Sequence, residues 1–299
     1  MRIDEAPVVD VRGPLTAQRE RLLRLLDSLS PDQWAAPTVA PHWSVKDIAL
    51  HLLGVDLSWL ARHRDRDQSG IIPVPPGHEE FVRTLAQHNQ RWVDGARALS
   101  PQLITGLLRW SGEQLDAYLA TVDLMRPSSV YWAGQAPLWF DLAREFTERW
   151  VHYRQIEEAA RPGLPKQGQD EYLPLVLRTF VWGFPHQYRA PAPAGTAIAV
   201  DIPGIGGWTL TRTATGWSLD EGNAAGPAAD GGHAGPAADE GHARPAADGG
   251  HAAPAASLRI SGEAAWRLLT GAPYDPGQVQ LSGDPALAEP LLQVRGIIV

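Results

Sequence analysis

The character of the chain changes after Gly163, and this change limits the folds that are open to it. Before this point, apolar residues recur at the helical period in segments separated by proline, glycine and serine. After it, short runs typical of strands alternate with turn residues and a few short helical segments. Helices followed by strands are typical of the α+β class. We therefore expect a helical bundle of the four-helix type over residues 1–163 and a small α+β domain with an antiparallel sheet over residues 170–299.

Start and stop signals divide each half into elements. Ser44 and Asp47 form the capping-box pattern S-x-x-D at the start of one expected helix. The expected helices cover residues 16–29, 44–62, 79–99, 101–120 (as one helix or two), 137–160, 172–184 and 262–271, with a last one after residue 285. The expected strands cover residues 196–202, 207–213, 216–221, 257–261 and 278–283.

A nonapeptide repeat interrupts the second half. GPAADGGHA begins at Gly226 and recurs with small changes, so that histidines fall at His233, His242 and His251. A nine-residue period is also found in calcium-binding β-rolls, but this repeat lacks the bulky apolar residue that such rolls stack into a core. Proline, glycine and alanine offer little surface to bury, so we expect a disordered insert over residues 222–256, with weak metal binding as the alternative.

Charge and hydropathy exclude several classes of partner. The formal net charge is −8, and no basic stripe is available to neutralise phosphates, so a nucleic-acid partner is not expected. No apolar run approaches the roughly 20 residues that cross a bilayer, and the N-terminal residues lack the apolar core of a signal peptide. We expect a cytoplasmic protein with no membrane partner.

The chain contains no cysteine. This excludes disulfides, a catalytic thiolate and any cysteine-bound zinc. The ten histidines and 34 acidic residues must therefore supply any metal ligands. If the protein carries out thiol chemistry, the thiol has to arrive as a bound co-substrate.

Two helical segments carry candidate metal ligands. His51 lies in residues 43–54, and Glu148 and His152 lie four residues apart in residues 145–158. Residues i and i+4 are neighbours on one side of a helix, so Glu148 and His152 are able to bind one ion, and His51 from another helix completes a His/Glu/His set. Three ligands leave positions open for water or substrate, which suggests catalysis rather than a structural site.

The same residues allow a different interpretation. His51 lies at the edge of an apolar helix face, where a lone histidine is often a hydrogen-bonded core residue. In the later helix, Glu148 and His152 share a polar stripe with Asp141 and Glu145, roughly opposite an apolar stripe. This pattern favours a solvated face, and spacing alone leaves both interpretations open.

A resemblance to a known family favours the metal site. The segment W-x-x-P-T-x-x-x-x-W-S-V-K-D-I-A-x-H-L, from Trp34, resembles the N-terminal signature of the DinB-like, mycothiol-dependent maleylpyruvate isomerase family. Residues 147–156, TERWVHYRQI, are similar to that family's later metal-binding helix, and residues 257–292 are similar to its small sterol-carrier-like domain. The resemblance implies that His51, Glu148 and His152 bind a divalent metal, usually zinc, and that mycothiol is a co-substrate.

The function expected from this resemblance is a metal- and thiol-dependent transferase or isomerase that acts on a small electrophilic substrate. The reacting group is a metal-bound thiol or water at His51, Glu148 and His152, and no catalytic side chain is assigned. The alternatives are a hydrolase or lyase that uses metal hydroxide, and a non-catalytic protein that binds the metal or an apolar ligand. The sequence leaves the physiological substrate and the oligomeric state open.

Several further residues have two interpretations each. Asp47 either orients His51 or only caps its helix, and capping is the expected role. Glu145 is either a base or a neighbouring surface acid, and the surface acid is expected. Arg212 and Arg259 are candidates for anchoring a substrate carboxylate, although exposed cations are more common on strands. His42 stands where relatives often have glycine, so the loop before His51 is expected to differ.

Overall fold

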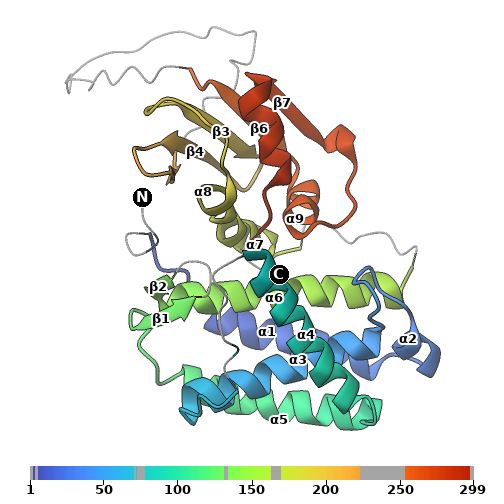
Figure 1. Ribbon diagram of the computed structural model, residues 1–299. Coiled ribbons are helices and arrows are strands. Elements are labelled where there is room, and N and C mark those ends of the chain that lie inside the picture. Colours follow the sequence, from blue (N-terminus) through green and yellow to red (C-terminus); the bar gives the residue numbers. More distant parts are fainter. Residues whose placement is uncertain are drawn as a thin grey trace, which may run out of the picture.

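The computed structural model describes residues 3, 6–70, 72, 78–130, 134–162, 170–222 and 253–296. The three repeat histidines, and nearly all of the expected insert over residues 222–256, lie outside these ranges. Helices fill the first half and a sheet with a few helices fills the second, so the α+β class is confirmed. Figure 1 shows the sheet above the helical part, with the long helix α6 between the two.

The helical part is close to the expected pattern. Its helices are α1 (Arg12–Asp27), the short α2 (Pro31–Ala35), α3 (Val45–Trp59), α4 (His78–Ala96), α5 (Pro101–Leu119) and α6 (Leu138–Ala160). Pro101 starts a single helix rather than two, and α3 continues directly into a π-helical turn, Leu60–Arg64. An apolar cluster that includes Leu26, Leu50 and Ile156 joins these helices into a bundle.

Local capping fixes where the site-bearing helix α3 begins. The Ser44 hydroxyl accepts a hydrogen bond from the Asp47 amide, and the Asp47 carboxylate accepts one from the Ser44 amide. This reciprocal box satisfies two backbone donors at the helix start. The helix therefore enters the bundle in a defined position one turn before His51.

A two-stranded hairpin precedes α6 and was not expected from the sequence. Its strands are β1 (Pro127–Val130) and β2 (Gly134–Pro137), and they pair in antiparallel fashion. Neither strand alternates apolar and polar residues, because the hairpin is short and β1 has Ser128 and Ser129 at its centre. The period-two pattern that identifies strands in a sequence is therefore missing here.

The second half carries a five-stranded sheet at the expected places. Its strands are β3 (Ala197–Ile202), β4 (Gly206–Arg212), β5 (Trp217–Glu221), β6 (Ala256–Ile260) and β7 (Val279–Gly283), in the order β5-β4-β3-β6-β7. Every neighbouring pair is antiparallel except β3 and β6, which are parallel. Parallel neighbours require a long crossover, and the chain from β4 through the repeat to β6 supplies one.

Short helices lie between the sheet and α6 (Figure 1). They are α7 (Leu173–Phe180), α8 (Gly183–Gln187) and α9 (Gly262–Thr270), and α10 (Pro285–Ala288) and the 3-10 turns Pro276–Gln278 and Glu289–Gln293 complete this half. The single helix expected over residues 172–184 is divided in two. A side chain at Gly183 would meet the Arg295 carbonyl oxygen at 2.4 Å, so the start of α8 has to be a residue without one.

The two halves share one hydrophobic core, and α6 is at its centre. The apolar cluster of the sheet extends through α7 and α9 to α6, where Trp150 meets Trp266 edge-to-face with ring centroids 5.5 Å apart. Phe146 meets Tyr172 in the same way at 5.4 Å. Phe146 and Trp150 of the apolar stripe of α6 therefore face the second half. Leu142 and Tyr153 of the same stripe pack in the bundle, and the polar stripe faces the bundle as well.

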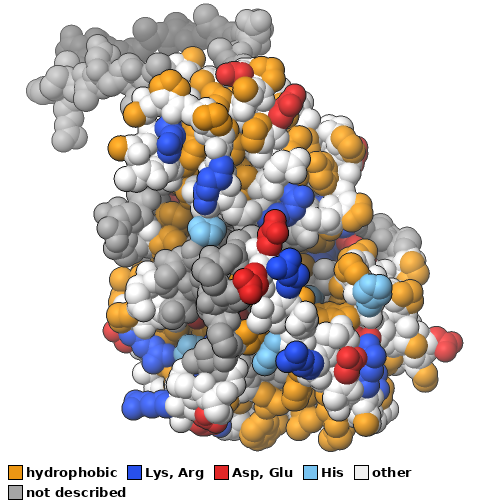
Figure 2. Space-filling view, viewed as in Figure 1, with side chains coloured by type: hydrophobic (Ala, Val, Ile, Leu, Met, Phe, Trp, Pro, Cys, Tyr) orange, Lys and Arg blue, Asp and Glu red, His pale blue; other side chains and the backbone are white. Residues whose placement is uncertain are grey.

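The surface carries mixed charges. On the face shown in Figure 2, arginine and lysine side chains are interspersed with aspartate and glutamate. No helix in the described ranges combines the length and the apolar character needed to cross a membrane.

Candidate metal centre

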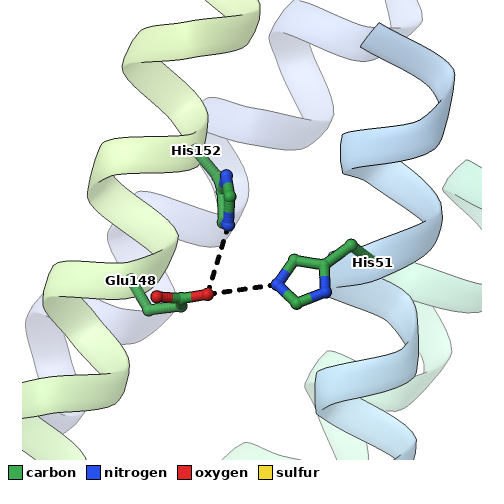
Figure 3. Close-up of side chains that lie close together, drawn as sticks. All are labelled: His51, Glu148 and His152. Atoms are coloured by element: carbon green, nitrogen blue, oxygen red, sulfur yellow. Dashed lines mark hydrogen bonds and ion pairs between the residues drawn. The ribbon is translucent and has the colours of Figure 1, made fainter. Parts of the chain in front are cut away.

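Helices α3 and α6 bring His51, Glu148 and His152 together. His51 is almost fully buried, with 4% of its surface exposed, while Glu148 and His152 keep about an eighth of their side chains accessible. Figure 3 shows His51 pointing from α3 toward the Glu148 and His152 pair on α6. One ligand atom from each side chain lies within 4.8 Å of the other two, and no other such group occurs in the described part of the chain.

One oxygen of Glu148 faces both imidazoles. Its Oε1 atom lies 3.1 Å from Nε2 of His51 and 3.2 Å from Nε2 of His152 (Figure 3). In a tetrahedral set with bonds of about 2.1 Å, neighbouring ligand atoms are about 3.4 Å apart. Two imidazole nitrogens and a carboxylate oxygen are also the donor types that zinc accepts. The three residues therefore fit a divalent metal ion both in chemistry and in spacing.

Electrostatics keep these groups in the forms that bind metals. Burial lowers the pKa of His51, and its contact with Glu148 only partly offsets this, so the neutral imidazole is favoured. Burial alone would raise the pKa of Glu148. Its contacts with His152 and His51 hold that pKa well below its usual value, so Glu148 stays anionic.

Trp43 forms an aromatic wall beside the two histidines. Its ring centroid lies 5.0 Å from that of His51 and 6.3 Å from that of His152. The indole N–H donates to the Gln90 side-chain oxygen at 2.9 Å, which ties Trp43 to α4. The preceding residue, His42, has a φ of 69°, in the left-handed region that favours glycine. The loop therefore keeps a conformation suited to glycine, although histidine stands there.

The polar stripe of α6 is largely buried, so the alternative interpretation as a solvated face is wrong. Glu145 is only 5% exposed, and the expectation that it is a surface acid is also wrong. Its carboxylate accepts hydrogen bonds from Arg144 and from Arg149, the latter at 2.7 Å, and Arg149 also donates to Asp56 of α3 at 2.7 Å. These arginines take the place of water as hydrogen-bond partners of the buried Glu145 carboxylate.

Glu145 is accordingly a structural anion. Burial would raise its pKa, but the charges of Arg144 and Arg149 lower that pKa to about 2. A carboxylate held in this way is a poor proton acceptor, so a role as general base is not supported.

Other residues considered from the sequence lie away from the cluster or have other partners. Asp47 pairs with Ser44 and with Arg97 rather than with His51, so its expected capping role is confirmed. Arg259 is half exposed and pairs with Asp201 on the neighbouring strand β3, as expected for a solubilising cation. Arg212 lies near the end of β4, opposite Trp217 of β5.

Sequence reasoning missed two residues that help to position the cluster and its aromatic neighbour. Gln155, one turn after His152 on α6, lies with its Oε1 atom 2.8 Å from Nδ1 of His152. Gln90 anchors Trp43 from a helix that is distant in the sequence. The i,i+3 spacing of His152 and Gln155 was a visible signal for the first contact. No sequence signal points to the second.

The fold and the site together define a helical bundle with a cluster of three candidate metal ligands, joined to a small α+β unit. Residues 15–157 match the family model of the mycothiol maleylpyruvate isomerase N-terminal domain. These residues, 15–157, therefore belong to the family of the mycothiol maleylpyruvate isomerase N-terminal domain, which is named for an enzyme.

A solved structure agrees in fold. A crystal structure of a mutant of the mycothiol-dependent maleylpyruvate isomerase aligns with a TM-score of 0.51 and 13% identity, over 94% of this chain and 95% of that one. A further crystal structure of that isomerase aligns over the same shares at 14% identity and a TM-score of 0.48. No curated protein sequence matches the chain. At 13% identity, the similarity to the mutant's crystal structure is evidence for the fold alone.

Proposed function

We propose that the protein is a cytoplasmic, zinc-dependent enzyme that uses mycothiol as a co-substrate to isomerise a small electrophilic substrate or to transfer the thiol to it. The observation that carries the proposal is the convergence of His51, Glu148 and His152 in a chain without cysteine. Membership of a family named for a mycothiol-dependent isomerase supports the choice of thiol.

The chain's own residues suit this chemistry. A zinc ion bound by two neutral imidazoles and one carboxylate keeps a net positive charge and lowers the pKa of a coordinated thiol toward neutrality. His51 contributes a neutral ring because it is buried, and Glu148 contributes the negative charge. Trp43 covers one side of both rings and limits the access of water to them.

The reaction needs no side-chain nucleophile. A thiolate that adds to an electrophilic double bond forms a carbon–sulfur bond and leaves a single bond about which the substrate rotates. Expulsion of the thiolate then restores the double bond in the other geometry. If a leaving group departs instead, the product is a thioether and the reaction is a transfer. The protein's task in either case is to bind, orient and activate the thiol.

The test combines metal content with thiol dependence. The purified wild type is expected to bind one zinc ion per chain and to consume an electrophile only when a low-molecular-weight thiol is added. His152→Ala and Glu148→Gln are expected to lose both properties, since each removes a ligand or its charge. His88→Ala, at an exposed position on α4, is the matched control and should retain both.

The opposite results have definite meanings. Turnover in thiol-free buffer would overturn the thiol reaction in favour of a metal-hydroxide enzyme. Failure of the wild type to bind any divalent ion would overturn the metal-dependent enzyme as a whole.

A further inference from the structure

The His152 ring is held at both of its nitrogen atoms. Its Nε2 atom faces Glu148 Oε1 at 3.2 Å, and its Nδ1 atom lies 2.8 Å from Oε1 of Gln155. All three residues are on α6, with Glu148 one turn before His152 and Gln155 one turn after it. The imidazole therefore lies between a carboxylate and a side-chain amide oxygen.

The contact with Gln155 fixes which nitrogen carries the proton. An amide oxygen only accepts hydrogen bonds, so Nδ1 of His152 donates one when Nε2 is bound to a metal ion. In a neutral imidazole the proton on Nδ1 leaves the lone pair on Nε2. That lone pair is directed toward the space that Glu148 and His51 share (Figure 3).

We infer that Gln155 is a positioning residue that holds His152 in the Nδ1–H tautomer and directs its Nε2 atom at the metal position. The inference rests on the proposed metal site. A partner of this kind fixes both the orientation of the ligand ring and its tautomer before an ion arrives.

The need for such a partner differs between the two histidines. His51 of α3 is 4% exposed, and Trp43 lies beside its ring, so packing restricts the rotation of that ring. His152 is more accessible, and Trp43 is farther away, at 6.3 Å between ring centroids. A hydrogen bond from Nδ1 is the contact that restricts the ring where packing is weaker.

Three variants test the inference. Gln155→Leu removes the acceptor while keeping a side chain of similar size, and Gln155→Glu keeps an acceptor and makes it anionic. Gln87→Leu makes the same chemical change at an exposed site on α4 and is the control. Each protein is stripped of metal, and its zinc affinity is measured by competition with a chromophoric chelator.

We expect Gln155→Leu to weaken zinc binding by about 10- to 100-fold, as is typical for loss of such an outer partner. Gln155→Glu should bind at least as tightly as the wild type, and Gln87→Leu should not change the affinity. A thermal melt that stays within a few degrees of the wild type excludes unfolding as the cause.

A second measurement needs no metal. Nitrogen chemical shifts of the His152 ring in the metal-free wild type should show a proton on Nδ1, whether or not Nε2 also donates to Glu148, and the Gln155→Leu variant should lose this preference. Unchanged zinc affinity together with an unchanged tautomer in Gln155→Leu would overturn the inference. If the wild type binds no zinc, the proposed function fails, and the tautomer measurement still decides the role of Gln155.

Discussion

Arg149 holds two buried carboxylates, so its replacement should be costly. Its side chain is 11% exposed, and its two terminal nitrogens donate to Glu145 of α6 and to Asp56 of α3, each at 2.7 Å. Methionine in its place fills similar apolar space but donates no hydrogen bond. The Arg149→Met variant therefore leaves both carboxylates buried without their shared cation.

The expected loss of stability depends on the partners that the two carboxylates keep in the variant. Removing one partner of a buried ion pair costs about 3–5 kcal/mol. Asp56 keeps a hydrogen bond from Ser111 at 2.8 Å, and Glu145 keeps Arg144, so the lower end applies. We expect Arg149→Met to lower the free energy of unfolding by about 3 kcal/mol. In a chain of this size that loss lowers the melting temperature by roughly 6–12 °C.

Calorimetry and urea unfolding of the metal-free protein at neutral pH measure this loss. Arg24→Met is the matched control, because Glu20 and Arg24 form a pair with the same i,i+4 spacing while their side chains are 64% and 68% exposed. That control should change the stability by no more than about 0.5 kcal/mol. The reasoning would be refuted if the two variants lost equal stability. The double variant Arg149→Met with Glu145→Gln should recover part of the loss, since one unpaired charge is gone.

Three further outcomes are expected. The pKa of Glu145 in the folded protein, about 2, lies below its ordinary 4.5. The ionised carboxylate therefore stabilises the fold by about 3 kcal/mol above pH 4.5, and this effect is lost as the pH falls toward 2. Between pH 7 and pH 2 the melting temperature of Glu145→Gln should fall less than that of the wild type. His42→Gly should raise the free energy of unfolding by about 0.5 kcal/mol in a urea titration, because it relieves more left-handed backbone strain than it adds flexibility. The control His88→Gly, within helix α4, should lower the free energy of unfolding by about 1 kcal/mol in the same titration. Gln18 is 1% exposed, and neither of its side-chain amide atoms has a protein partner, so Gln18→Met should raise the urea midpoint through a gain of about 1 kcal/mol; a lower midpoint would mean that the amide is satisfied after all.

Much of the fold was predictable because its signals are local. The capping box of Ser44 and Asp47 marks the start of α3 in the sequence, and the structure has the same reciprocal hydrogen bonds. The four-residue spacing of Glu148 and His152 on one helix follows from helical geometry alone. The class of the fold follows from the change of periodicity after Gly163. Two of the four strand pairings in the larger sheet, β3 with β4 and β4 with β5, need no information beyond short turns and alternation.

The placement of β6 depended on the tertiary structure. The alternation in residues 257–261 predicts a strand but does not name its neighbour, and β6 pairs with β3 in parallel rather than with β5. The hairpin of β1 and β2 was missed for a related reason. Its stability comes from its position beside α6, and the pattern of its own residues does not encode that contact.

The candidate site also combines features that the sequence predicts with features that only the tertiary structure determines. The sequence by itself determined that Glu148 and His152 share one side of a helix and that any thiol must come from outside the chain. The tertiary structure decided that this side faces inward, where His51 and Asp56 of α3 meet it, and that Glu145 is buried rather than solvated. Helical periodicity separates an apolar stripe from a polar one, but it does not say what each stripe contacts. Because the second half of the chain covers the side of α6 that carries Phe146 and Trp150, the polar stripe is left to the bundle, and buried charges there have to find partners.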